Sequence, residues 1–313
     1  MLKRVRVECG VHHVDMADTH SARDILKKIR HIELKTRGLV QTAFSGQYRS
    51  AFKGRGMNFE EVREYQPGDD VRAIDWNVTA RMGDAFIKKF TEERELTVML
   101  VVDVSASGEF GSVHLSKREL AAEVACVFAF SAIRNNDKVG CILFSDHVEL
   151  FIPPAKGRLH SLRIIREILF FEPKGRGTDL AGALEFLNRV TSRRAVVLML
   201  SDFHAPDYTK QLRVTARRHD LVAMTIVDPR ELELPDVGRI VLEDAETGER
   251  VLVDTSDRRT RVRYASEVGG WHGDLPSGFR RLGVDTITLQ TNQDYVPALR
   301  RFFSTREHRL SMG

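Results

Sequence analysis

A carboxylate and two hydroxyl groups stand close together in the segment Asp103-Val-Ser105-Ala-Ser107. This segment directly follows Leu96–Val102, in which the apolar residues are almost continuous, as is typical of a strand buried on both faces. Open α/β sheets bind their ligands at the carboxyl ends of such strands. One acid and two neutral oxygens suit a hard divalent cation, and they include no nucleophile–base pair for covalent catalysis.

Two other loops could bring oxygen atoms to the same edge of a sheet. Ala195–Leu200 is a second continuous apolar run, and it is followed by Ser201 and Asp202. Between the two runs lies a glycine-containing loop in which Thr178 or Asp179 could begin a helix. The sequence therefore offers oxygen-bearing side chains on three loops, two of which follow predicted strands.

The chain from residue 96 onward alternates between segments of strand length and segments of helix length. Strands are expected at 96–102, 138–145, 148–152, 195–200, 221–227 and 284–289, and helices at 117–133, 158–171, 180–190, 209–219 and 295–303. This order predicts an α/β fold with a doubly wound, mostly parallel six-stranded sheet, in which only the hairpin 138–152 supplies an antiparallel edge. A second hairpin near 236–254 interrupts the alternation, and a long polar helix near 256–282 should be irregular at Gly269-Gly270 and Pro276.

The first third of the chain is organised differently. Residues 1–24 show no periodicity and are expected to form a variable extension, whereas residues 25–95 form a smaller β-containing part and residues 96–313 the main domain. A helix beginning near Ser21 would place Ile25, Ile29 and Ile32 on one face, with basic residues around it. Such a face could lie on a membrane surface or pack on its own domain.

Length and composition limit the possible classes of function. The 313 residues are 42% hydrophobic, but no apolar run approaches the ~18–20 residues of a membrane span, and no signal peptide is evident, so a cytoplasmic location is expected. Residues 1–56 carry a net charge of +7, against +4 for the whole chain. This basic arm allows at most peripheral membrane contact. No aromatic residues interleave with the basic ones to form a nucleic-acid platform, so no specific nucleic acid is expected.

The three loops resemble the metal-ion-dependent adhesion site (MIDAS) of von Willebrand factor A (vWA)-like domains. That resemblance implies that Asp103, Ser105, Ser107, Thr178 and Asp202 bind a divalent cation, with Mg²⁺ expected first and Mn²⁺ or Ca²⁺ as other candidates. The alternative is that the two aspartates cap their loops and that Thr178 caps the following helix.

The N-terminal motifs resemble one bacterial family in particular. Gly54-x-Gly56-x-x-Phe59, the Arg63–Trp76 segment and Ala80-Arg81, followed by the Asp-x-Ser-x-Ser segment, are similar to domain-of-unknown-function family fifty-eight. Its members are vWA-like and are associated with MoxR-type AAA+ ATPases. Charged residues between 63 and 81 could pair with one another to brace this region, or could face the ATPase.

The resemblance implies a non-enzymatic, metal-dependent protein-binding module. In that role, the chain would work with a MoxR-type ATPase in chaperone-like assembly or maturation of protein complexes, and an acidic residue of a client would complete the cation's coordination. The alternative is a metal-dependent hydrolase that uses Asp103, Asp202 and His204. The chain has no Gly-Lys-[Ser/Thr] segment, which argues against ATP binding through a P-loop. It also has no Gly-x-Ser-x-Gly elbow, which argues against an α/β-hydrolase.

Overall fold

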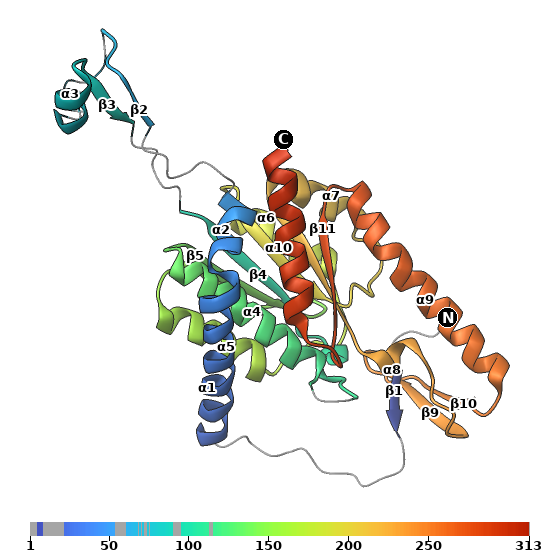
Figure 1. Ribbon diagram of the computed structural model, residues 1–313. Helices are drawn as coiled ribbons and strands as arrows, with labels where there is room; N and C mark the ends of the chain where they lie inside the picture. Colours follow the sequence, from blue (N-terminus) through green and yellow to red (C-terminus); the bar gives the residue numbers. More distant parts are fainter. Residues whose placement is uncertain are drawn as a thin grey trace.

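A six-stranded sheet forms the centre of the computed structural model, which describes residues 5–8, 22–53, 61–67, 69, 71, 74, 76–89, 95–112 and 115–312 (Figure 1). The strands are β4 (Thr97–Asp103), β5 (Lys138–Phe144), β6 (Val148–Ala155), β7 (Val196–Ser201), β8 (Asp220–Val227) and β11 (Asp285–Gln290). Their order is β11-β8-β7-β4-β5-β6, and all neighbours are parallel except β5 and β6. The predicted α/β fold is therefore confirmed.

The strand order changes direction between β4 and β7. The chain proceeds from β4 to β5 and β6 on one side, and then returns to place β7, β8 and β11 on the other side. In doubly wound sheets, the loops that leave the two strands at this point diverge and leave a crevice for a ligand. Strands β4 and β7 pair from Val98 with Val196 to Val102 with Leu200, so Asp103 and Ser201 end neighbouring strands.

Helices cover both faces of this sheet. One face packs against residues of α1 (Ala22–Leu39), the π-helical turn η1 (Val40–Phe44), α2 (Ser45–Lys53), α4 (Lys117–Arg134), α5 (Arg158–Phe170) and α10 (Tyr295–Met312). The other face packs against α6 (Leu180–Val190), α7 (Thr209–Arg218) and α9 (Arg258–Arg281). The strands are therefore buried on both sides, which explains their continuous apolar sequences.

The N-terminal helix α1 packs on its own domain. Ile29 and Ile32 belong to the core cluster of the sheet face that α4 covers, and their exposed fractions are only 9% and 3%. Lys35 and Lys28, on the same helix, form ion pairs with Glu123 and Glu119 of α4. This packing accounts for the apolar face of α1 without a membrane surface. Among the described residues, no helix combines the length and hydropathy needed to cross a bilayer.

A smaller sheet interrupts the α/β alternation after β8. The short helix α8 (Pro229–Leu232) leads into the hairpin of β9 (Arg239–Asp244) and β10 (Arg250–Asp254), as the sequence predicts. The β1 strand (Val5–Glu8) adds to β9 in antiparallel register, a pairing that the sequence analysis did not anticipate.

Helix α9 corrects one expectation. It runs from Arg258 to Arg281 without the predicted irregularity, and Pro276 lies inside it. Tyr264 near one end packs in the core of the small sheet, whereas Phe279 near the other end packs in the core of the main sheet. Tertiary packing at both ends therefore outweighs the weak helix propensity of the glycines and the proline.

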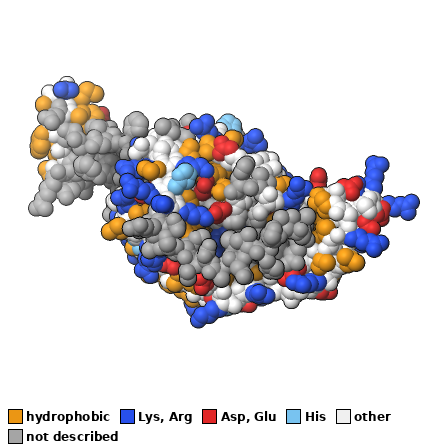
Figure 2. All heavy atoms as spheres, turned by 90° about the horizontal axis from the view of Figure 1, so that it is seen from below, with side chains coloured by type: hydrophobic (Ala, Val, Ile, Leu, Met, Phe, Trp, Pro, Cys, Tyr) orange, Lys and Arg blue, Asp and Glu red, His pale blue; other side chains and the backbone are white. Residues whose placement is uncertain are grey.

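Among its described residues, the segment between α2 and β4 contributes a two-stranded antiparallel sheet and one short helix. These are β2 (Glu61–Glu64), β3 (Phe86–Lys89) and α3 (Trp76–Met82) (Figure 1). Asp70, Arg72 and Asp75 lie outside the described residues, so the predicted charge pairing at 63–81 stays a prediction. Figure 2 shows basic side chains spread over the visible face among acidic and apolar ones.

Candidate functional site

Both carboxylate oxygens of Asp103 are held at the end of β4. The Ser105 backbone N–H donates to Oδ1 at 2.9 Å, and the Ser201 hydroxyl donates to Oδ2 at 2.6 Å. The first contact is the loop cap expected in the alternative without a metal. The second contact crosses to the end of β7, so Asp103 joins the two loops that border the crevice.

Ser105, Ser107 and Asp202 form one buried cluster in this crevice. The Ser105 and Ser107 hydroxyl oxygens are 3.2 Å apart, and Ser107 donates to Asp202 Oδ2 at 2.9 Å. The exposed fractions of the three residues are 0%, 4% and 8%. The other Asp202 oxygen accepts a hydrogen bond from the His204 backbone N–H at 3.0 Å. The side chains of three of the five predicted site residues, Ser105, Ser107 and Asp202, are therefore linked to one another by hydrogen bonds.

A buried lysine, which the sequence analysis missed, adds a positive charge. Lys117, the first residue of α4, donates to Asp202 Oδ2 at 3.0 Å and to Glu231 Oε1 at 2.6 Å. Burial alone would lower the pKa of this ammonium, but the two carboxylates outweigh burial and raise it. The lysine links the candidate site to α8, because Glu231 belongs to that helix.

The loop that carries Thr178 is packed against the first loop. The Ala106 backbone N–H donates to the Arg176 carbonyl at 3.2 Å. Nearby, the Gly175 N–H donates to Glu149 at 2.8 Å. A Cβ atom at position 175 would overlap the Ser145 hydroxyl and the Asp146 carboxylate, so a larger residue would require these side chains to move.

Thr178 does not cap the helix that follows it. Asp179 is the N-cap of α6, and its side chain accepts a hydrogen bond from the Gly182 N–H at 2.9 Å. The Thr178 hydroxyl instead donates at 2.8 Å to Oε1 of Glu246, which lies in the turn of the β9–β10 hairpin. Of the two roles considered for Thr178, the structure therefore excludes the helix cap. Glu246 is a second residue that the sequence analysis missed.

The donor set suits a hard cation. Serine and threonine hydroxyls with nearby carboxylates are all oxygen ligands, which Mg²⁺ and Mn²⁺ prefer. Where the chain is described, no three His, Cys, Asp or Glu side chains are grouped so that they could hold a metal ion. A cation at this site would therefore depend on hydroxyl oxygens and water for much of its coordination.

The histidine of the hydrolase alternative packs against an aromatic ring. His204 and Trp271 lie edge to face, with ring centroids 4.8 Å apart. Trp271 belongs to α9, so the β7–α7 loop and α9 meet beside the candidate site. This contact gives the imidazole a packing role.

Comparisons with known proteins agree with the N-terminal motifs. The sequence profile described as "Protein of unknown function DUF58" matches residues 61–270. The uncharacterized protein Mb1516 of Mycobacterium bovis is 34% identical over 282 residues, which are 89% of this chain and 88% of that protein.

Similar solved structures are more distant. The BatB protein from Bacteroides thetaiotaomicron aligns over 70% of this chain and 100% of its own, at 13% identity and a TM-score of 0.43. The SpRpn10 VWA domain aligns over 68% of this chain and 95% of its own, at 9% identity and a TM-score of 0.36.

Proposed function

The chain belongs to the family of proteins of unknown function DUF58, and from this premise we propose that it is a non-enzymatic, metal-dependent module that binds an acidic residue of a partner protein. One observation carries the proposal. Ser105, Ser107 and Asp202 meet in a buried cluster at the point where the strand order reverses. Ligands of doubly wound sheets bind at that point.

The expected cation is Mg²⁺, with Mn²⁺ or Ca²⁺ as alternatives. Ser105, Ser107 and Thr178 would supply hydroxyl oxygens to it, and Asp103 and Asp202 would hold it directly or through water. When bound, the cation would attract a carboxylate from outside the site. Hydrogen bonds from other residues of the chain would orient the two carboxylates toward the cation. Ser201 donates to Asp103, and Lys117 donates to Asp202.

The proposed partner is a MoxR-type AAA+ ATPase, and the proposed role is chaperone-like assembly or maturation of protein complexes. Family analogy supports this step, because the same motifs that place the chain in its family occur in proteins associated with such ATPases. The acid that completes the site would come from a client or from the ATPase.

Calorimetric titration with Mg²⁺ and Mn²⁺ tests the cation. At ten times Kd, binding should stabilise the native state by about 1.4 kcal/mol, and Asp103→Ala should abolish this gain. Asp207→Ala is the matched control, because Asp207 is exposed in the loop that follows β7. Absence of binding by the wild-type protein at millimolar cation would refute the proposal.

Co-purification tests the partner. The ATPase should be retained by the wild-type protein when Mg²⁺ is present and released by a chelator, and Ser105→Ala should weaken its retention. Equal retention in chelator and in Mg²⁺ would mean that this site does not hold the ATPase.

A further inference from the structure

The turn of the β9–β10 hairpin places a carboxylate beside Thr178, one of the proposed cation ligands. Glu246 Oε1 accepts the Thr178 hydroxyl hydrogen bond at 2.8 Å, and Thr178 is only 9% exposed. The turn itself is well fixed, because the backbone N–H groups of Glu246 and Thr247 donate to Asp244 Oδ1 at 2.9 and 3.0 Å. Gly248, at a φ of +71°, closes the turn with a backbone bond to the Asp244 carbonyl. The position of Glu246 is therefore set by the hairpin.

A second carboxylate, from the short helix α8 that precedes this hairpin, reaches the site by another route. Glu231 binds Lys117, which also binds Asp202. The segment from α8 to the end of β10 is anchored at its start by Asp228, which is fully buried and accepts hydrogen bonds from Ser112 and Thr291. This segment thus contacts Thr178 directly through Glu246, and Asp202 indirectly through Glu231 and Lys117.

We infer that Glu246 is a resident carboxylate of the cation site, and that a partner's acidic residue binds by replacing it. This inference rests on the proposed function. A hydroxyl that donates its proton to a carboxylate still has lone pairs for a cation. The Thr178–Glu246 contact therefore places an acid beside a proposed cation ligand, where the site would otherwise accept an external acid.

The geometry also indicates the class of partner. Glu246 is presented at the tip of a tight, glycine-containing turn between two short strands. A competing ligand would present a Glu or Asp in a similar protruding turn. The ligand must also compete with Glu246, which is tethered to the site and has an effective concentration on the order of millimolar. A single exposed acidic side chain would therefore bind weakly.

Glu246→Gln separates this inference from the proposed function. The substitution keeps the size of the side chain and removes its charge. Glu249→Gln is the matched control, because Glu249 is exposed in the same turn. We expect Glu246→Gln to weaken Mn²⁺ binding by about 10–100-fold, as for other residues that support a metal site, while Glu249→Gln leaves binding unchanged. Circular dichroism and the melting temperature verify that both variants are folded.

A second measurement uses a labelled, cyclised peptide of residues 243–250 as the probe. In Mn²⁺, Glu246→Gln protein should bind this peptide at least about tenfold more tightly than wild-type protein does, because the tethered competitor is gone. If wild type and both variants bind Mn²⁺ equally, Glu246 is not a resident carboxylate, although the proposed cation site stands. If no protein binds Mn²⁺, both ideas fall.

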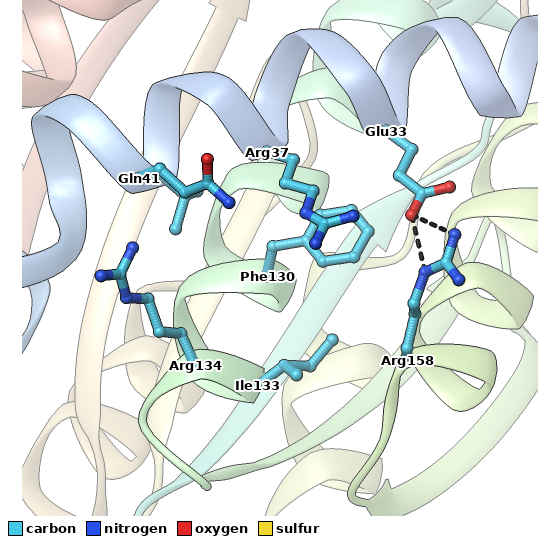
Figure 3. Close-up of a pocket in the computed structure, with 8 residues that line it drawn as sticks. Glu33, Arg37, Gln41, Phe130, Ile133, Arg134 and Arg158 are labelled. Carbon is cyan, nitrogen blue, oxygen red and sulfur yellow. Dashed lines mark hydrogen bonds and ion pairs between the residues drawn. The ribbon is translucent and has the colours of Figure 1, made fainter.

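An arginine-lined pocket carries an independent inference. A pocket of about 550 Å³ lies where α1 and η1 meet α4 and α5 (Figure 3). It reaches Arg134, the last residue of α4, whereas the candidate site contains Lys117, the first residue of that helix. Its polar lining consists of Arg37, Gln41, Arg134, Arg158 and Glu33, and its apolar lining of Val40, Phe130 and Ile133.

The charges of this pocket are unbalanced. Glu33 is held by Arg158, with the guanidinium Nε 2.7 Å and Nη2 2.6 Å from Oε1. Within the described part of the chain, no carboxylate lies within 4.0 Å of the guanidinium nitrogens of Arg37 or Arg134. Figure 3 shows these two side chains, with Gln41, projecting from α1, η1 and α4 around the pocket. Both arginines are exposed, and guanidinium groups that have no carboxylate partner can bind an anion that enters the pocket.

The backbone is also unusual here. The π-helical turn that begins at Val40 supplies two of the lining residues, Val40 and Gln41. π-Helical turns are rare and occur frequently at functional sites. A pocket of this volume is within the usual range for small-molecule sites.

We propose that the pocket binds a phosphate ester whose organic group is apolar, with Arg37 and Arg134 on the phosphate and Phe130 and Ile133 against the organic group. Phenyl phosphate is the probe for a soluble ligand, and phosphatidylglycerol vesicles are the probe for a lipid headgroup. The double variant Arg37→Ala/Arg134→Ala should lose binding to whichever probe the wild type binds by at least about tenfold. Arg163→Ala, an exposed arginine on α5, should not.

NMR titration and vesicle sedimentation measure these two arms. Binding of phenyl phosphate without vesicle binding would identify a soluble ligand, and the converse would identify a membrane lipid; either result, lost in the double variant, supports the pocket. Equal binding by wild type and double variant, or no binding to either probe, overturns it.

Discussion

Lys117 offers the most direct test of how the candidate site is held together. Its side chain is 4% exposed, and it contacts the side chains of Asp202 and Glu231, which are 7% and 16% exposed. Lys117→Met keeps much of the side-chain volume but leaves two carboxylates without their shared ammonium. Breaking a buried ion pair by removing one partner costs about 3–5 kcal/mol, because the remaining charge stays buried.

This loss should be visible as a lower melting temperature. At about 2–4 °C for each kcal/mol, Lys117→Met should melt about 6–20 °C below wild type when followed by circular dichroism at pH 7. Lys210→Met is the control, because Lys210 is exposed on α7, and its melting temperature should be unchanged. Adding Asp202→Asn and Glu231→Gln to Lys117→Met should recover most of the loss, since no unpaired charge would remain.

A fall of less than about 2 °C in Lys117→Met, equal to that of the control, would contradict this reasoning. It would mean that water or rearranged side chains reach the two carboxylates easily. The site would then be more open than the exposed fractions of its residues indicate.

Other substitutions probe the elements that position the site. Gly175→Ala should lower the free energy of unfolding by about 1 kcal/mol in urea titration, because its Cβ would displace the Ser145 hydroxyl from its hydrogen bond with Glu149. Gly177→Ala, which has more room, should be nearly neutral. Phe303→Ala should cost about 3–5 kcal/mol in the same assay, because the ring is fully buried among other phenylalanine rings. For Asp228, burial favours the neutral form, but hydrogen bonds from hydroxyl and backbone groups outweigh burial and lower its pKa. The ionised carboxylate therefore stabilises the folded protein at neutral pH, and this stabilisation is lost on acidification. The free energy of unfolding of Asp228→Asn should be about 1–3 kcal/mol lower than that of wild type at pH 7, and this difference should shrink below about pH 3.9.

Much of the central sheet could be predicted from local sequence. The runs before Asp103 and Asp202 are continuous and apolar because helices cover both faces of the sheet. The polar residues that follow these runs must lie at strand ends, so their chain position alone brings them to one edge. This is why Ser105, Ser107 and Asp202 could be placed together before the structure was known.

The remaining site residues depend on contacts between distant segments. Lys117 is the first residue of a helix, a position that is commonly exposed, and its burial follows from Glu231, 114 residues away. Glu246 lies in a polar hairpin turn, and only its distance of 68 residues from Thr178 is visible in the sequence. The continuity of α9 across Pro276 likewise depends on packing at its two ends. Local patterns contain no information on such pairings.

The shared packing of α1, α2 and α10 determines where this protein can be divided. Phe44 and Phe52 of the N-terminal helices pack on Phe303 of α10, and Arg306 of α10 donates to the Ala51 carbonyl. The region matched by the family profile, residues 61–270, contains none of these helices. A fragment cut to that region would keep α4 and α5 but lose α1, α2 and α10, so Phe128 and the other apolar side chains that these helices cover would be exposed to water, and we expect the fragment to aggregate. We therefore expect a fragment that folds stably to extend beyond residues 61–270 on both sides.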